Sequence, residues 1–215
     1  ISSEVAVRYV LYLNSNHPDL QTEITYASNP TSQRYAIEID STNPQIVIIH
    51  GDFAHAKVLG LLASHDFDTV FHFAAQPRVE VSVKNPVAVT NENLNKTLSL
   101  ARACAQADVR LIFSSTSAIY GNTSELPTSE MAPQSATNPY GLSKFCAEEY
   151  LALFEKLYGL DWTALRYFNA YGPGQVGDSP YCTAIAAWCH KASHGEALRS
   201  DGDGEQTRDL VYVTD

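Results

Sequence analysis

The sequence predicts an α/β protein built on a doubly wound parallel sheet. Short apolar runs of strand length alternate along the chain with longer stretches that have helical periodicity. The 215 residues, of which 45% are hydrophobic, are enough to bury a full core. Both observations favour a layered sheet with helices packed on it.

The overall charge excludes some classes of partner. The net charge is −10 and the pI is about 5.0, which argues against binding to nucleic acid. No apolar run approaches the roughly 20 residues of a membrane-spanning helix, so no membrane partner is expected. The four cysteines show no C-x-x-C spacing, and His72 has no second metal ligand at a suitable distance along the chain. We therefore expect a cytoplasmic protein without a metal site.

The N-terminal third is predicted to contain helices and strands in alternation. Residues 4–13 have the periodicity of an amphipathic helix, and residues 23–27 and 45–50 have the composition of strands. Asp52 follows the second of these strands and can cap a helix at about residues 54–64.

The centre of the chain continues the alternation. Residues 68–73 form the next predicted strand, which ends in Ala74 and Ala75, and these small side chains let a flat ligand approach the backbone closely. A long helical stretch follows. Residues 109–113 then predict a buried strand that runs into a hydroxyl-rich segment at 114–117.

A tyrosine and a lysine stand four residues apart at the start of the next helix. Tyr140 and Lys144 share one face of that helix. The lysine charge favours the phenolate, so a tyrosine with an ordinary pKa of about 10 can exchange protons nearer neutral pH. Tyr140 is thus a candidate general base, although an isolated Y-x-x-x-K is more often an ordinary surface pair. The hydroxyls at 114–117 favour the catalytic interpretation, because open α/β sheets bind ligands at the ends of their strands.

Together these residues resemble the Ser/Thr-Tyr-Lys triad of the short-chain dehydrogenase/reductase superfamily, and its NAD-dependent epimerase/dehydratase branch in particular. The resemblance puts the triad hydroxyl at Thr116. It implies a Rossmann-like domain over residues 1–171 and a partial substrate-binding lobe over residues 172–215. In that family a first strand and a glycine-rich turn precede a helix such as 4–13, and neither is found in the sequence. The resemblance therefore implies an N-terminally truncated domain. It separately implies that the C-terminal lobe is incomplete.

The same resemblance implies an NAD site, with NADP left open. Lys96 stands where the family usually has glycine, and the capping role of Asp52 can coexist with a cofactor contact. The implied cofactor contacts are Asp52, Phe53, Phe73, Ala74, Ala75, Asn93, Ser114, Tyr140, Lys144, Tyr167 and Phe168.

The C-terminal part is similar to UDP-glucose 4-epimerases. Its Arg-Tyr-Phe-Asn segment at 166–169 is followed by Tyr-Gly-Pro. The resemblance implies a UDP-sugar substrate that contacts Thr116, Tyr140, Asn169 and Arg208, and it implies a homodimer.

The residues after Thr116 bear on the type of reaction. The 4,6-dehydratases of this family carry acidic residues there, whereas this chain has Ser117 and Ala118. Elimination of water needs a further acid and base, so we expect epimerisation at C4 instead. The alternatives are a 4,6-dehydratase relative and a non-catalytic member of the same fold.

Overall fold

Two compact units make up the chain, residues 1–165 and residues 166–215. The computed structural model describes residues 8–12, 36–39, 46–50, 52–64, 67–178, 182–200 and 202–215. The predicted boundary between the two lobes, at Tyr171, lies beyond the boundary between the units, and the roles given to the two lobes stay predictions.

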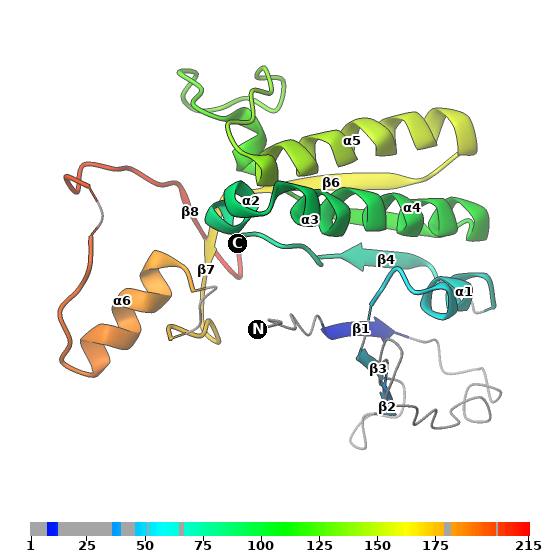
Figure 1. The fold of residues 1–215 in the computed structure, drawn as a ribbon, viewed down its shortest axis with the longest axis horizontal. Coiled ribbons are helices and arrows are strands. Elements are labelled where there is room, and N and C mark those ends of the chain that lie inside the picture. Colours follow the sequence, from blue (N-terminus) through cyan, green and yellow to red (C-terminus); the bar gives the residue numbers. More distant parts are fainter. Residues whose placement is uncertain are drawn as a thin grey trace. The chain divides into compact units, whose positions relative to one another are not determined.

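The first unit alternates strands and helices (Figure 1). In chain order its elements are β1 (Arg8–Tyr12), β2 (Ala36–Ile39), β3 (Ile46–His50), α1 (Ala56–Ser64), β4 (Thr69–His72), α2 (Val79–Lys84), α3 (Pro86–Thr90), the π-helical turn η2 (Asn91–Asn95), α4 (Lys96–Ala107), β5 (Arg110–Thr116), the 3₁₀ turn η3 (Ser117–Tyr120), α5 (Pro139–Tyr158) and β6 (Trp162–Tyr167). The last two residues of β6 belong to the second unit.

The central sheet has the strand order β4–β5–β6. β4 and β5 pair in parallel, in a register that joins Thr69 to Arg110 and His72 to Phe113. Side chains on a strand alternate between the two faces. Val70 and His72 of β4 are accordingly buried, whereas Phe71 is 60% exposed. The predicted α/β class with a parallel sheet is confirmed.

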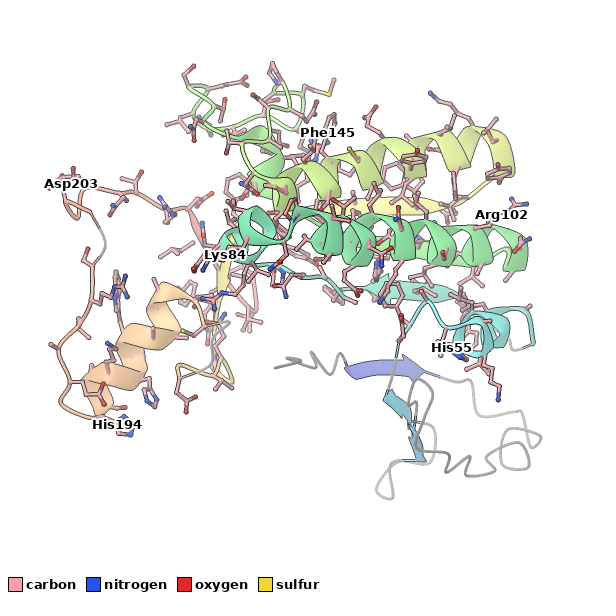
Figure 2. The ribbon with its side chains drawn as sticks, viewed as in Figure 1. His55, Lys84, Arg102, Phe145, His194 and Asp203 are labelled. Atoms are coloured by element: carbon pink, nitrogen blue, oxygen red, sulfur yellow. The ribbon has the colours of Figure 1, made fainter. Side chains whose placement is uncertain are left out.

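The main core lies between this sheet and helices α4 and α5, which run side by side in Figure 1. Its fully buried members include Leu111 and Phe113 of β5, Cys104 of α4 and Leu151 of α5. A smaller cluster of Ile119, Tyr120 and Ala132 packs against Phe145, which Figure 2 labels near the first turns of α5.

Local signals in the sequence fix the ends of α5. Asn138 caps its first turn, because the side chain accepts a hydrogen bond from Gly141 N at 2.9 Å. Pro139 takes the first helical position, where its missing N–H costs nothing. Gly159 ends the helix with φ of 71°, in the left-handed region that favours glycine.

The N-terminal strands form a separate antiparallel sheet, in the order β1–β3–β2. β3 confirms the strand predicted at residues 45–50. The helix predicted at residues 4–13 is wrong where the structure describes it, because residues 8–12 are the strand β1. This run of Tyr, Val and Leu has a high strand propensity, and pairing with β3 outweighs its helical periodicity. The strand predicted at residues 23–27 lies outside the described residues.

The second unit is held by a short parallel pair. β7 (Asn169–Tyr171) pairs with β8 (Leu210–Tyr212), so that Asn169 lies opposite Leu210. α6 (Ala184–Ser193) lies between them in the chain and is capped by Thr183, whose hydroxyl accepts from Ala186 N. In the part of the chain that the structure describes, no helix is long and apolar enough to cross a membrane.

Candidate active site

The end of β5 meets the first turns of α5, and this brings Tyr140 and Thr116 together. Tyr140 is hydrogen-bonded to the Thr116 hydroxyl. The Thr116 oxygen also accepts from Ala118 N at 3.2 Å, which caps the short turn η3. A hydroxyl in this position can orient a second oxygen-bearing group, such as a substrate alcohol, beside the phenol.

Burial raises the pKa of Tyr140, while the hydrogen bond from Thr116 lowers it, and burial has the larger effect. The prediction that Lys144 brings this pKa towards neutrality is therefore wrong for the protein alone. The ammonium of Lys144 donates to Ser114 O at 2.8 Å and lies 4.6 Å from the centre of the Phe113 ring.

Lys144 is only 1% exposed, although it carries an ammonium group. Burial lowers its pKa to about 8. An ammonium has three N–H donors, and only one is needed for the Ser114 carbonyl. Lys144 can therefore offer the others to a ligand at the same strand end.

The structure thus brings four predicted site residues together, namely Ser114, Thr116, Tyr140 and Lys144. Their proximity follows from the parallel sheet, since β5 delivers its last residues to the start of α5. The catalytic roles of these residues stay predictions.

Asn93, a predicted cofactor contact, is fully buried and holds two segments together. Its Oδ1 accepts from Gln76 N at 2.7 Å, and its Nδ2 donates to Gln76 O at 3.1 Å and to Ser143 Oγ at 3.2 Å. Ser143 in turn donates to Tyr140 O at 2.7 Å. The amide therefore links the exit of β4 to the turn that carries Tyr140. Sequence reasoning missed Ser143, whose only local signal is its place next to Lys144.

His72 continues this buried polar network. Thr97 donates its hydroxyl hydrogen to Asn93 O at 2.8 Å, so its oxygen is left to accept from His72 Nε2, also at 2.8 Å. The proton of the neutral ring is thereby assigned to Nε2, and Nδ1 has no partner among the described residues. Burial, and secondarily the charge of Lys144, lowers the pKa of His72 to about 3.

The other predicted contacts at the exit of β4 differ in exposure. Ala74 is buried, Ala75 is half-buried, and Phe73 is 60% exposed, with its ring stacked 6.5 Å from that of Phe71. Both alanines follow directly after β4, and their contact with a cofactor stays a prediction.

Asp52 and Phe53 have partners within the protein. Asp52 Oδ1 accepts from Ala54 N at 2.9 Å, and Oδ2 pairs with Lys96 at 2.9 Å. Lys96 also binds Glu92 at 2.6 Å. The lysine that departs from the family pattern is thus held between two carboxylates. Phe53 is a core residue, with its ring 4.9 Å from that of His72.

The second unit carries the remaining predicted residues. Tyr167 and Phe168 are partly exposed. Asn169 Nδ2 donates to Asp209 O at 2.8 Å, and Asp209 is the residue after Arg208. Arg208 donates to Thr207 O at 2.7 Å. The pairing of β7 with β8 therefore brings Asn169 close to the segment that carries Arg208, a second predicted substrate contact, within this unit.

Within the described ranges, His, Cys, Asp and Glu side chains form no group of three or more that could hold a metal ion.

A family model described as the NAD dependent epimerase/dehydratase family matches residues 10–215. The chain belongs to this family. This confirms the resemblance drawn from Thr116, Tyr140 and Lys144.

Several relatives are named as sugar-nucleotide epimerases. A putative UDP-glucose 4-epimerase of Methanocaldococcus jannaschii is 34% identical over 178 residues, which are 82% of this chain and 58% of the relative. The UDP-glucose 4-epimerase of Halalkalibacterium halodurans is 35% identical over 184 residues, 79% of this chain and 55% of the relative. The chain thus spans little more than half the length of these relatives.

Solved structures agree with the sequence comparison. The UDP-glucose 4-epimerase of Thermotoga maritima, solved with UDP-glucose, has a TM-score of 0.72 and 36% identity, with 76% of this chain and 54% of that chain covered. The Thermus thermophilus UDP-glucose 4-epimerase, solved with NAD, has a TM-score of 0.67 and 34% identity, with 75% and 54% covered. The Streptomyces venezuelae dTDP-glucose 4,6-dehydratase follows with a TM-score of 0.68 and 29% identity, and coverage of 80% and 52%.

Proposed function

We propose that this chain carries the catalytic centre of a UDP-sugar 4-epimerase, which inverts C4 of a UDP-hexose by transient oxidation with NAD. The observation that carries the proposal is the meeting of Thr116, Tyr140 and Lys144 at the end of β5. The relatives named above act on UDP-sugars, which supports the same substrate class here.

The residues of the first unit fit part of a dinucleotide site. Lys144 keeps donors beyond the one it gives to Ser114, and it lies beside Tyr140 at a strand end. The small, half-buried side chain of Ala75 would let a flat ligand approach the backbone closely. Lys144 and Tyr140 would hold NAD, with NADP left open. When bound, NAD supplies a reversible two-electron oxidation of the sugar carbon.

The side chains of this chain would supply positioning and proton transfer. Tyr140 takes the proton of the C4 hydroxyl and later returns it, and Thr116 orients that hydroxyl by a hydrogen bond. Burial raises the pKa of Tyr140, so its action as a base needs positive charge beside the phenol. In the protein alone, Lys144 does not lower this pKa enough to offset burial.

The second unit supplies the candidate phosphate contacts. Arg208 is suited to the diphosphate because a guanidinium binds phosphate oxygens in a bidentate way. Asn169 Nδ2 donates one hydrogen to Asp209 O, and its second hydrogen would bind the same diphosphate.

We propose a homodimer as well. Tyr150, Leu153 and Leu157 of α5 are exposed apolar side chains, and a second copy would remove them from water.

The dehydratase alternative differs in the product. Similarity to a 4,6-dehydratase structure keeps it open. Ser117 and Ala118 follow Thr116 in η3, so no carboxylate stands directly after the candidate triad hydroxyl to assist elimination.

Product analysis tests the proposal. The chain is incubated with NAD and UDP-glucose, and the sugar is examined by mass spectrometry and proton NMR. We expect UDP-galactose of unchanged mass, and a rate that falls by roughly 10²–10⁴-fold in Tyr140→Phe but less in Thr116→Ser, which keeps the hydroxyl. Loss of water from the product would establish the dehydratase instead, and bound UDP-glucose without turnover would favour the non-catalytic alternative.

A further inference from the structure

α5 presents a stripe of side chains spaced four residues apart to the end of β5. Residues with this spacing share one face of a helix. Tyr140, the first of them, is hydrogen-bonded to Thr116. Lys144, one turn later, donates to Ser114 O at 2.8 Å. These two contacts hold the outer two of three consecutive strand residues.

Glu148 is the third member of the stripe, a further turn along. It is 5% exposed, and its carboxylate accepts a hydrogen bond from Ser115 Oγ, which is 3% exposed. Ser115 is the residue between Ser114 and Thr116. Every residue of this strand end is thus bound by a different turn of the same helix, and neither Glu148 nor Ser115 has a part in the function proposed above.

We propose that Glu148 is a positioning residue for the reaction. By accepting the hydrogen bond from Ser115, it fixes the position of the end of β5 along the axis of α5. In this position the Thr116 hydroxyl reaches the phenol of Tyr140. The inference rests on the proposed function, because Glu148 has this task only if Tyr140 and Thr116 act on the substrate.

The chemistry of the contact suits a fixed anchor. A hydroxyl bound to a carboxylate makes a stronger hydrogen bond than one between neutral groups, and burial strengthens it further. Adjacent strand residues are only about 3.3 Å apart, so a shift at Ser115 is passed directly to Thr116. A misplacement of about 1 Å in a catalytic group can cost on the order of 100-fold in rate.

The pKa of Tyr140 separates positioning from a merely structural role. The hydrogen bond from Thr116 lowers this pKa, so loss of alignment raises it. Removal of the negative charge of Glu148 acts in the opposite direction, because a phenolate is less strongly repelled without it. A rise therefore reports a change in geometry and not a change in charge.

The experiment follows the carbon-13 NMR signals of ring-labelled tyrosine through a pH titration, with Tyr140 assigned by the signal lost in Tyr140→Phe. Glu148→Ala and Ser115→Ala are expected to raise the pKa of Tyr140. Glu148→Gln keeps an acceptor for Ser115 and removes only the negative charge, so the pKa of Tyr140 should not rise above the wild-type value. In a Thr116→Val background, Glu148→Ala should no longer raise it. The matched control is Glu149→Ala, which removes an exposed carboxylate from the next position of the helix.

In turnover assays, Glu148→Ala is expected to lower kcat by roughly 10- to 100-fold, with KM for UDP-glucose little changed. An unchanged or lowered pKa of Tyr140 in folded Glu148→Ala or Ser115→Ala would overturn the proposal. If Glu148→Ala does not fold, Ser115→Ala is the deciding variant, because it breaks the same hydrogen bond and removes only one oxygen atom. The titration needs no turnover, so a failure of the epimerase proposal is seen separately, as absent product.

Discussion

Asn93 offers a sharp test of the buried polar network, because its side-chain oxygen faces a hydrogen-bond donor and its side-chain nitrogen faces hydrogen-bond acceptors. Its Oδ1 accepts from Gln76 N, and its Nδ2 donates to Gln76 O and to Ser143 Oγ. Asn93→Ala removes all of these bonds. Asn93→Asp keeps the shape and the acceptor but sets a second oxygen against the Gln76 carbonyl.

The expected losses follow from these contacts. A net hydrogen bond contributes about 1 kcal/mol and an unsatisfied buried group costs about 1–3 kcal/mol, so Asn93→Ala should lower the free energy of unfolding by about 2–4 kcal/mol. At neutral pH Asn93→Asp should cost about 3–5 kcal/mol, because it leaves a buried charge without compensation. The isosteric change is thus expected to be at least as harmful as the truncation.

The pH dependence of Asn93→Asp has a definite sign. Burial raises the pKa of the new carboxyl in the folded state above its unfolded value of about 3.9. The protonated form can donate to Gln76 O, so the folded variant is most stable below the unfolded pKa and loses stability as the pH rises through the folded pKa.

Urea unfolding at about pH 4.5 and about pH 7.5 measures the effect, always as the difference from the wild type at the same pH. The matched control is Asn95→Asp, at an exposed position of the same π-helical turn, which should change stability little at either pH. Equal losses for Asn93→Asp at the two pH values, or a smaller loss than that of Asn93→Ala at neutral pH, would refute the assigned network.

Three further outcomes are expected. Because burial lowers the pKa of Lys144 to about 8, Lys144→Met should stabilise the fold by about 1–3 kcal/mol near pH 7, and the gain should shrink between about pH 8 and pH 10 as the wild-type ammonium loses its proton in the folded state first. Urea unfolding measures this gain, and a gain that grows with pH would contradict the reasoning. A Cβ at Gly141 would lie 2.7 Å from Ala118 O, so Gly141→Ala should lower the melting temperature despite a gain of about 1 kcal/mol in helix propensity. A higher melting temperature would contradict this close approach. Lys96→Met should cost less than about 1 kcal/mol, since its pairing with Asp52 is partly exposed, and the loss should disappear in about 1 M salt.

The sequence predicts the central residues of the candidate site because the sequence signals for these residues are local. Tyr140 and Lys144 are one helical turn apart, and Thr116 ends a strand that leads towards that helix. Once a parallel sheet is assumed, these facts bring the three residues to one end of the sheet.

The contacts that hold the site could not be predicted in the same way. Asn93 bonds to residues 17 and 50 positions away, and Lys96, the first residue of α4, reaches Asp52, which precedes α1. Such pairings depend on how elements pack, and no periodicity or motif specifies them. The pKa of Tyr140 also depends on burial, which the spacing of Tyr140 and Lys144 does not reveal.

The strand β1 shows where local reasoning gives two answers. Residues 8–12 have a helical repeat and a composition that favours a strand, and pairing with β3 decides between them. Strand propensity depends on tertiary context more than helix propensity does, so a short apolar run is ambiguous until its neighbours are known.

The stacked rings of Phe71 and Phe73 have a practical consequence for experiments on this chain. Both side chains are 60% exposed, Phe71 within β4 and Phe73 directly after it. Environment-sensitive dyes such as ANS become fluorescent on exposed apolar surface, and their binding is commonly taken as a sign of a molten state. The folded chain is expected to bind such a dye at these rings, so its dye-based melting curves should start from a high fluorescence baseline. Phe71→Ser or Phe73→Ser should lower that baseline without loss of the helical circular dichroism signal.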